Sequence, residues 1–493
     1  MSCLLVQEVA TELTPERLAE QFRFEPGMML LRTALFESAR DRYSFLTLRP
    51  ILTFRSFGSR CEIESSTGHL VQFGNPWLLL AQWMSRYELL DDLDLPFPLG
   101  GCFGYWGYDL KNFTEPKLKR GARNELELPD CYLGFYASLL AIDQQLGKSW
   151  IISTGLAPDG SRSEAQAQRD LAWWQSQLGN QARPPSLEPR SDQDFWSEYR
   201  TAPLVSDCSR DEFIRRVKRA QNYIRAGDIY QVNLSHRLQM RRPVAGWQLF
   251  NRLTSLSPAP FAAFLNCGDF QIVSSSPELF LRMSGAQIQT RPIKGTRPRS
   301  ECATRDAQLA YELQTSAKET AELVMITDLL RNDLGKVCEF GSVHTPELVR
   351  LERYPQVQHL VSTVQGRLRP EVDHLTALAS CFPGGSITGA PKFRAMEIID
   401  ELERTARGPY TGALGYLGFN RETQLSMTIR TAICKRGAVY FPVGAGIVAD
   451  SNPEAEYEET LVKARGFFAA LGLGINSLQP CPLGPEEVFG PGS

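Results

Sequence analysis

The chain has 493 residues, 43% of them hydrophobic, which is enough for one large buried core or for two or three ordinary domains. A formal net charge of −3 and a pI near 6.1 give no electrostatic reason to expect nucleic acid or an anionic membrane as a partner. No apolar run approaches the roughly 18 residues of a membrane helix, and residues 1–8 lack the basic start of a secretory signal. The composition therefore predicts a cytoplasmic protein with a small-molecule ligand.

The 11 cysteines are scattered without any Cys-x-x-Cys pair, which is typical of reduced, buried thiols and not of a disulfide framework or a zinc site. Gly100-Gly101-Cys102-Phe103-Gly104 matches the Gly-x-Cys-x-Gly turn of a glutaminase nucleophile letter by letter. None of the five histidines begins the accompanying His-x-Glu pattern. We therefore interpret Cys102 as a core residue.

The composition changes at a Pro-, Gln- and Ser-rich interval at about residues 155–194. This interval lacks apolar periodicity apart from a helical patch at 171–178. Alternating segments such as 139–152 precede it and predict antiparallel strands. After it, helices do not alternate strictly with strands, so we predict an α+β fold with large antiparallel sheets and not a doubly wound fold. The predicted parts are an amino-terminal region 1–154, a linker with a short helix 155–208, a catalytic region 209–475 and a flexible carboxy-terminal tail 476–493.

Apolar periodicity after the linker predicts the elements that frame a candidate site. They are helices at 211–226 and 317–331 and after Pro391, paired strands at 270–282 and 286–292, and a strand at 425–430. In the last of these strands Arg430 points away from Leu425, Met427 and Ile429, because side chains alternate along a strand. An arginine placed in this way suits the recognition of a carboxylate.

Lys294 is a candidate nucleophile, shortly after the acidic residue Glu278. An amine attacks carbon only in its neutral form, which burial beside Ile293 and the neighbouring cations Arg291 and Arg297 favour. Glu278 is then a candidate acid partner. The alternative is an exposed ammonium group at a strand end, because most lysines are exposed.

Carboxylates on two predicted helices form a candidate metal site. Glu322 lies on an apolar helical stripe, and Glu456 and Glu459 share one face of a second helix. With no histidine or cysteine nearby in sequence, these residues suit Mg²⁺ better than zinc. The alternative is an ordinary charged face on each helix, where Lys318 or Lys463 one turn away supplies a partner worth about 0.3–0.5 kcal/mol.

Two glycine-rich segments are candidate anion sites. The loop 382–392 precedes an amphipathic helix and offers backbone N–H groups at a helix start. It is not a Walker A loop, because Lys392 follows Pro391 and the Gly-Lys-Ser/Thr sequence is missing. The second segment, Gly444-Ala445-Gly446, ends a strand just before the helix of Glu456.

Together these blocks resemble the chorismate-utilising enzymes, a family that contains the large subunits of anthranilate and aminodeoxychorismate synthases and the isochorismate and salicylate synthases. The resemblance runs from about residue 30 to residue 472 and is strongest from Asp211 onward. It implies one large, twisted antiparallel sandwich with peripheral helices, which the amino-terminal third completes. The blocks that occur in the order of the family surround Glu278, Lys294, Glu322, His359, Ser386, Arg430, Gly446 and Glu459.

Two positions distinguish the reactions within this family. Isochorismate-forming members carry a lysine base where this chain has Gln231, which disfavours activation of water. Anthranilate synthases resemble Pro-Ile-Ala-Gly-Thr where this chain has Lys294 in place of the alanine. Lysine at that position is typical of the members that form 4-amino-4-deoxychorismate from chorismate and ammonia for folate biosynthesis. Anthranilate formation and a catalytically silent, chorismate-sensing subunit stay open as alternatives.

The resemblance also implies a role for each matching residue. Lys294 is implied as the nucleophile, Glu278 as the general acid and base, and His359 as an active-site histidine, with a hydrogen-bonded core imidazole as the alternative. The implied Mg²⁺ ligands are Glu322 and Glu459, with Glu456 in a water-bridged position. The implied substrate contacts are Ser386, Tyr410, Arg430, Lys463 and the N–H groups of Gly444, Ala445 and Gly446.

A partner and an effector follow from the same resemblance. It implies a separate glutamine amidotransferase subunit that supplies ammonia, and therefore a heterodimer. It also implies a tryptophan pocket, and whether tryptophan binds there as a regulator or as a structural plug stays open. The residues of this pocket are Ser38, Tyr43, Ser44, Pro260, Phe261 and Ala262.

Overall fold

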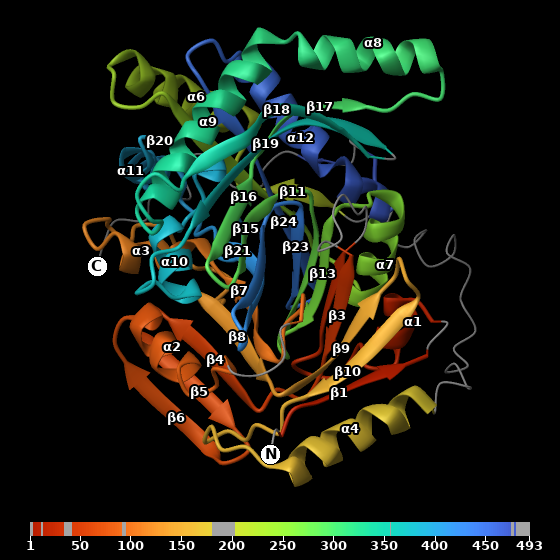
Figure 1. Cartoon of the computed structure of the whole chain (residues 1–493). Helices are drawn as coiled ribbons and strands as arrows, with labels where there is room; N and C mark the ends of the chain where they lie inside the picture. The colour runs from red at the N-terminus through yellow and green to blue at the C-terminus, as the bar shows by residue number, and fades with distance from the viewer. Residues whose placement is uncertain are drawn as a thin grey trace.

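The computed structural model describes residues 3–10, 13–33, 42–90, 95–179, 203–354, 356–474 and 478–479. The strands form two large antiparallel sheets, each of 12 strands, and helices lie around them (Figure 1). The predicted α+β fold with large antiparallel sheets is confirmed. No helix in these ranges is long and apolar enough to cross a membrane.

The first sheet combines strands from the beginning, the middle and the end of the chain. In spatial order they are β1 (Leu5–Val9), β10 (Lys148–Ser153), β9 (Ser138–Asp143), β3 (Tyr43–Thr47), β2 (Met29–Thr33), β13 (Phe261–Asn266), β14 (Phe270–Ser276), β23 (Thr431–Lys435), β24 (Ala438–Ile447), β12 (Gln231–Met240) and β11 (Leu204–Ser206), with β20 (Gly389–Ala390) paired to β12.

The second sheet is mixed in the same way. Its order is β17 (Ile293–Pro298), β19 (Val357–Arg367), β16 (Gln287–Arg291), β15 (Leu279–Ser284), β22 (Glu422–Met427), β21 (Ala413–Gly418), β7 (Gly101–Trp106), β8 (Cys131–Tyr136), β4 (Leu52–Phe57), β5 (Arg60–Ser65) and β6 (Gly68–Phe73), with β18 (His344–Arg353) paired to β19. Strands from before residue 154 thus pair directly with strands from after residue 209, β2 with β13 and β7 with β21.

The helices and short 3-10 turns are α1 (Pro15–Glu20), α2 (Pro76–Met84), η1 (Tyr108–Leu110), α3 (Lys111–Thr114), α4 (Glu164–Gly179), α6 (Arg210–Arg225), α7 (Gly246–Leu256), α8 (Ala303–Gln314), α9 (Ala317–Gly335), α10 (His374–Cys381), η3 (Gly385–Ile387), α11 (Lys392–Leu402) and α12 (Pro453–Ala470). The helices with the predicted carboxylates begin at side-chain caps. Ser316 accepts a hydrogen bond from the backbone N–H of Glu319 in α9, and Asn452 accepts one from Ala455 in α12.

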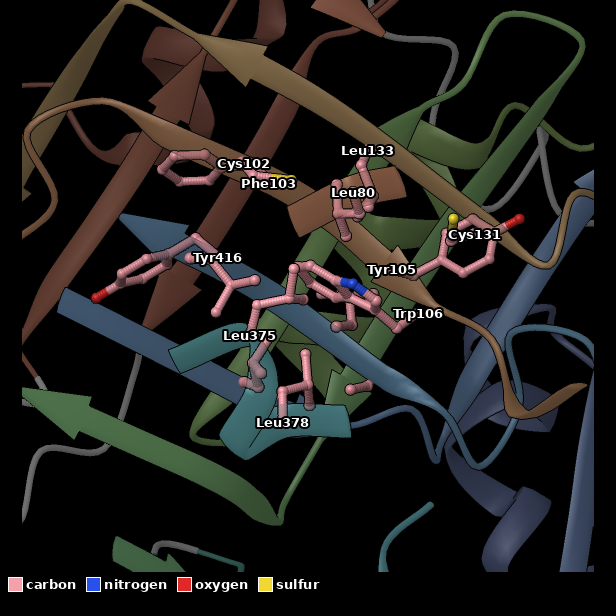
Figure 2. Close-up of a cluster of buried hydrophobic side chains, with 14 of the residues drawn as sticks. Leu80, Cys102, Phe103, Tyr105, Trp106, Cys131, Leu133, Leu375, Leu378 and Tyr416 are labelled. Atoms are coloured by element: carbon pink, nitrogen blue, oxygen red, sulfur yellow. The ribbon is translucent and has the colours of Figure 1, made fainter. Parts of the chain in front are cut away.

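Two hydrophobic cores fix the position of the sheets. One core lies between them, where Phe45 of the first sheet meets Tyr416 of the second with ring centroids 5.2 Å apart. The other core lies between the first sheet and its helices, where Phe441 of β24 stacks on Phe467 of α12. Figure 2 shows part of the first core, with Cys102 next to Phe103 among buried apolar side chains. The burial of Cys102 agrees with its interpretation as a core residue.

Several local predictions need correction. The predicted strand 270–282 is two strands, because β14 belongs to the first sheet and β15 to the second. The predicted strand 425–430 ends at Met427, and Arg430 has a left-handed φ of 49° just before β23. Leu478, placed in the flexible tail, forms a parallel bridge with Leu204. The helix in the linker is α4, which begins at Glu164 and not near residue 171.

Candidate active site

A cavity of about 450 Å³ lies where both sheets approach α9 and α12. These elements meet at the end of the molecule that is drawn at the top of Figure 1. The cavity brings together most of the residues that the sequence singled out. The predicted residues in its wall are Glu278, Lys294, Glu322, His359, Ser386, Tyr410, Arg430, Gly444, Gly446, Glu459 and Lys463.

Lys294 enters the cavity from an irregular strand. Its strand β17 pairs with β19 in a register that shifts between Lys294 and Thr296. Gly295 has a φ of +64°, and a Cβ at this position would lie 2.6 Å from Leu313 and 3.1 Å from Glu319. Only glycine fits this bulge without strain. The bulge lets Lys294, Gly295 and Thr296 all line the cavity.

The two neighbouring arginines do not act as the sequence suggested. Arg291 pairs with the buried carboxylate of Glu352, and Arg297 lies 3.6 Å from Glu319. Because each cation has a carboxylate partner, neither supplies an unbalanced positive charge next to Lys294. The expectation that Arg291 and Arg297 favour the neutral amine is therefore wrong. Partial burial of Lys294 in the cavity wall is the part of that expectation that remains.

Glu278 lies where the chain crosses from one sheet to the other, between β14 and β15. It is buried, with 6% of its surface exposed. Burial raises the pKa of Glu278, while a hydrogen bond from Ser386 and the charge of Lys294 oppose that rise. A carboxyl group in this environment can hold a proton at a pH where an exposed one is ionised. That property suits a general acid.

Arg430 lies at a second crossover, next to the first. The chain passes from β22 in the second sheet to β23 in the first, and the N–H of Ser275 donates to the Arg430 carbonyl over 3.0 Å. Burial lowers the pKa of Arg430, and the described part of the chain offers its guanidinium no ion-pair partner. Two adjacent crossovers thus place one acid and one cation in the same wall. A cation without a partner in a cavity fits an anionic ligand.

His359 is buried and held by its Nδ1 atom. This atom lies 2.9 Å from the Thr296 hydroxyl and 3.3 Å from the Gly295 carbonyl oxygen. Burial and the nearby Arg430 charge lower the pKa of His359 to about 4. The imidazole is therefore neutral near pH 7, and an Nδ1–H that donates to the carbonyl leaves Nε2 as an acceptor toward the cavity. It is both hydrogen-bonded and part of the cavity wall.

The predicted carboxylates and their alternative lysine partners are all found together. Lys318 lies 3.9 Å from Glu322 and 3.9 Å from Glu456, and Lys463 lies 2.8 Å from Glu459. Burial raises the pKa of Glu322 and of Glu456. Burial also opposes ionisation of Glu459, but Lys463 outweighs it and holds the pKa of Glu459 below its ordinary value. The acidic groups are thus paired with lysines, as the charged-face alternative expects, and the Mg²⁺ site stays a prediction.

The chemistry of these carboxylates suits a divalent cation, but only two of the three line the cavity. Glu322 and Glu459 line the same cavity, and each is close enough to the other for their charges to interact. Oxygen ligands of this kind suit Mg²⁺, which keeps several waters and needs few protein ligands. Glu456 instead accepts a hydrogen bond from Ser451 over 2.7 Å and is absent from the wall. In the part of the chain that the structure describes, no three acidic, histidine or cysteine side chains form a metal-binding group.

The end of β24 provides part of the substrate-binding wall. Gly444, Ala445 and Gly446 lie in the strand and not in a loop, and they pair with β12. Because side chains alternate, Ala445 faces the helix-side core while both glycines line the cavity. Lys463 donates to the Gly444 carbonyl over 2.9 Å, which fixes its ammonium group at this wall. The segment therefore lies at the end of a strand, as expected, and the contact of its N–H groups with a carboxylate stays a prediction.

Some candidate residues lie elsewhere. Lys392, at the start of α11, donates to Asp333 and to the Cys381 carbonyl, and no residue of this helix lines the cavity. Ser386 and Ile387 are the residues of the loop 382–392 that do. Gln231 is buried beside Gly446, and its amide atoms have no hydrogen-bond partner among the described residues. An amide cannot act as a base, in agreement with the expectation for this position.

The predicted tryptophan pocket is only partly described, because Ser38 lies outside the described residues. Phe261 lines two cavities of about 20 and 30 Å³, one shared with Pro260 and the other with Ala262. Volumes of this size hold only one or two water molecules. Ser44 accepts a hydrogen bond from the nearby Thr33 N–H, whereas the Tyr43 ring packs on Phe97 and Trp150. Tryptophan binding stays a prediction.

Sequence reasoning missed several groups at the site. Asn233 and Glu319 line the cavity. Arg407 forms a buried ion pair with Glu403 directly behind Tyr410. Arg407 lies three residues before Tyr410, but nothing in a single sequence distinguishes it from an exposed arginine. Two of its partners, the carbonyl groups of Asn233 and Ile387, come from other segments, and only the fold brings these together.

Comparison with known proteins agrees with this geometry. The sequence model described as chorismate binding enzyme matches residues 32–469. The chain belongs to the chorismate-binding enzymes. It is 37% identical to the aminodeoxychorismate synthase component 1 of Escherichia coli strain K12 over 470 residues, which are 95% of this chain and 97% of that protein. It is 36% identical to the anthranilate synthase component 1 of Acetivibrio thermocellus over 93% of this chain and 92% of that protein.

Among solved structures, the anthranilate synthase component I of Streptococcus pneumoniae superposes with a TM-score of 0.73 at 29% identity. The match covers 89% of this chain and 94% of the other. This likeness confirms the fold that the sequence resemblance implied. The cavity described above is thus the candidate active site of a chorismate-binding enzyme.

Proposed function

We propose that this chain is the large subunit of an aminodeoxychorismate synthase, which converts chorismate and ammonia to 4-amino-4-deoxychorismate in folate biosynthesis. The observation that carries the proposal is Lys294, whose amine lines the same cavity as the buried acid Glu278 and the cation Arg430, to which the described residues offer no ion-pair partner. Relatives named aminodeoxychorismate synthase component 1, at 36–39% identity, support it.

Chorismate carries two carboxylates, and the cavity offers cations for both. We assign the side-chain carboxylate to Arg430 and Lys463, with Ser386 and Tyr410 in the same wall. Mg²⁺, when bound by Glu322 and Glu459, would supply positive charge for the ring carboxylate. Glu456 would contact the ion only through a water molecule, because Ser451 already donates a hydrogen bond to one of its oxygens. Together these groups would orient the ring with one face toward Lys294.

The covalent step uses only groups of this chain. The neutral amine of Lys294 adds to C2 of the ring, the ring double bonds shift, and the C4–O bond breaks. Glu278 gives its proton to the departing hydroxyl, which leaves as water. Ammonia then adds at C4, the C2–N bond breaks and Lys294 leaves as an amine. Glu278 recovers its proton from the incoming nitrogen, and the enolpyruvyl group is retained.

The ammonia requires a source, because this chain offers no glutaminase site. Cys102 is buried in β7, and burial raises its pKa well above the usual value, so no thiolate is available there. We propose that a glutamine amidotransferase subunit supplies ammonia and forms a heterodimer with this chain. A cytoplasmic location fits the ten described cysteines, none of which forms a disulfide.

Anthranilate synthase component I is the second candidate, because relatives with that name are equally similar over most of the chain. Lysine in place of the alanine that is typical of those enzymes argues against it. The two functions differ in their products, since anthranilate formation releases pyruvate. We expect the purified chain with chorismate, Mg²⁺ and an ammonium salt to form 4-amino-4-deoxychorismate and no pyruvate, and Lys294→Ala to abolish that product. Pyruvate release without an added lyase would contradict the proposal.

A further inference from the structure

We propose that Arg407 and Glu403 form a positioning clamp that holds three segments of the cavity wall in register for chorismate. The inference rests on the proposed function, because it assigns the clamped wall to chorismate binding. Neither residue belongs to the groups assigned above to the substrate or to catalysis. The clamp acts through the segments that it ties together.

Arg407 is buried, with 3% of its side chain exposed, and it uses its whole guanidinium fork. It binds the carboxylate of Glu403 at two points, Nε to Oε2 over 2.8 Å and one terminal nitrogen to Oε1 over 2.7 Å. That terminal nitrogen also donates to the Asn233 carbonyl over 2.7 Å. The other donates to the Ile387 carbonyl over 3.2 Å and to the Thr411 hydroxyl over 3.3 Å. No ammonium group could replace this planar set of donors.

The three acceptors belong to three different segments of the wall. Asn233 lies in β12 and lines the cavity itself. Ile387 follows Ser386 in the loop before α11, and both line the cavity. Thr411 follows Tyr410, another residue of the wall. A single side chain thus fixes the spacing between β12, the Ser386 loop and the Tyr410 turn.

Glu403 completes the clamp from the other side. Its Oε1 atom accepts the backbone N–H of Ser235 over 2.8 Å, so the pair contacts β12 at two residues. The Asn233 side chain adds a bond of 3.1 Å to the same Ile387 carbonyl that Arg407 binds. The Arg407 guanidinium also lies 4.7 Å from the centre of the Tyr108 ring and 5.9 Å from that of Tyr410. Every nitrogen of the Arg407 guanidinium is therefore hydrogen-bonded, and the clamp lies one layer behind the cavity wall.

Stability alone is a weak reason for such a pair. Buried ion pairs gain little over well-packed apolar side chains, because both charges must lose water. A clamp whose acceptors are all neighbours of cavity-lining groups is better explained by precise placement of those groups. A displacement of roughly 1 Å in a positioning segment can lower catalytic efficiency by about 100-fold.

A second buried ion pair provides a matched control. Lys111 donates to Asp400 over 2.8 Å, and its side chain is 2% exposed, but neither residue lines the cavity. We would compare Arg407→Met, Arg407→Lys and Glu403→Gln with Lys111→Met in the full chain. For each variant the melting temperature, the Kd of chorismate by calorimetry, and kcat and KM with ammonium would be measured.

The clamp predicts that Arg407→Met and Glu403→Gln raise the chorismate Kd and lower kcat/KM by about 100-fold. In Lys111→Met both the Kd and kcat/KM should stay within about twofold of the wild-type values, although its melting temperature falls by a similar amount. Arg407→Lys should fail to restore kcat/KM, because an ammonium group lacks the fork. If Arg407→Met does not fold, Glu403→Gln and Arg407→Lys decide the question.

Wild-type kcat/KM in Glu403→Gln or Arg407→Lys would overturn the inference, as would losses no larger than those of Lys111→Met. The chorismate Kd of the wild-type protein and of each variant distinguishes a failure of the clamp from a failure of the proposed function. A wild-type protein that binds chorismate but forms a different product would refute the function and still test the clamp.

Discussion

Replacing Arg430 by methionine should stabilise the free protein while it weakens chorismate binding. The Arg430 guanidinium lies in the cavity wall, burial lowers its pKa, and the described residues give it no ion-pair partner. A partly desolvated charge without a partner costs about 1–3 kcal/mol, a cost that methionine of similar length does not carry. The left-handed φ of 49° strains both residues alike. We therefore expect the free energy of unfolding to rise by about 1–2 kcal/mol.

The effect on binding has the opposite sign. A charge-assisted hydrogen bond to a carboxylate contributes about 1.5–3 kcal/mol, so the Kd of chorismate should rise roughly 10- to 150-fold. Urea denaturation without ligand and calorimetric titration with chorismate measure the two quantities. Arg430→Lys is the control, since it keeps the charge and should gain no stability. A less stable Arg430→Met with an unchanged Kd would refute the reasoning and assign Arg430 to the fold.

Three further predictions concern single groups of the site. Lys318→Met should tighten Mg²⁺ binding by about threefold to tenfold in a calorimetric titration, because an ammonium group 3.9 Å from Glu322 repels a second cation. Weaker Mg²⁺ binding in this variant would contradict the idea that Lys318 and Mg²⁺ compete for Glu322. The kcat with ammonium should fall as pH rises through the raised pKa of Glu278, since the acid must begin protonated. Ser386→Ala should move this high-pH fall to still higher pH, and an unmoved fall would argue against the hydrogen bond. Cys102→Ala should keep ammonia-dependent turnover within about twofold of the wild-type rate and lower the free energy of unfolding by about 1 kcal/mol. If the purified chain used glutamine and this variant lost that activity, Cys102 would be a glutaminase nucleophile after all.

Much of the fold and most of the site could be predicted from the sequence. The period of apolar residues located the helices that became α6, α9 and α11 within a few residues. Glu322 and Glu459 were identified by their helical faces, and both line the cavity. These signals are local, since they depend on residues three or four positions apart. The helix in the structure keeps that spacing, so the predicted faces are correct.

The predictions that were wrong concern residues whose positions depend on contacts between distant segments. Arg430 was placed in a strand because its neighbours alternate, but the chain leaves one sheet and enters the other at that point. A crossover has no periodicity of its own, and the same reason hid the break at Glu278. The positive charge of Arg291 looked free in sequence, yet Glu352 lies 61 positions further along the chain and neutralises it.

The glycines of β24 illustrate a third limit. A Gly-Ala-Gly sequence predicts the end of a strand, because glycine weakens a strand. In the structure these glycines lie in the last residues of β24, where a Cβ at Gly444 would lie 2.6 Å from the Leu234 carbonyl oxygen and one at Gly446 would lie 3.1 Å from the Gln231 side-chain nitrogen. The need for glycine thus arises from the neighbouring strand β12, which is distant in the sequence, so no local sequence pattern reveals it.

The central claim is that Lys294 bonds covalently to the substrate ring. Intact-protein mass spectrometry of the chain with chorismate and Mg²⁺, without ammonia, tests it most directly. The proposal predicts an adduct heavier than the protein by one chorismate less one water, absent in Lys294→Ala and discharged when ammonium is added. An adduct that persists in Lys294→Ala, or full turnover by that variant with ammonium, would contradict it.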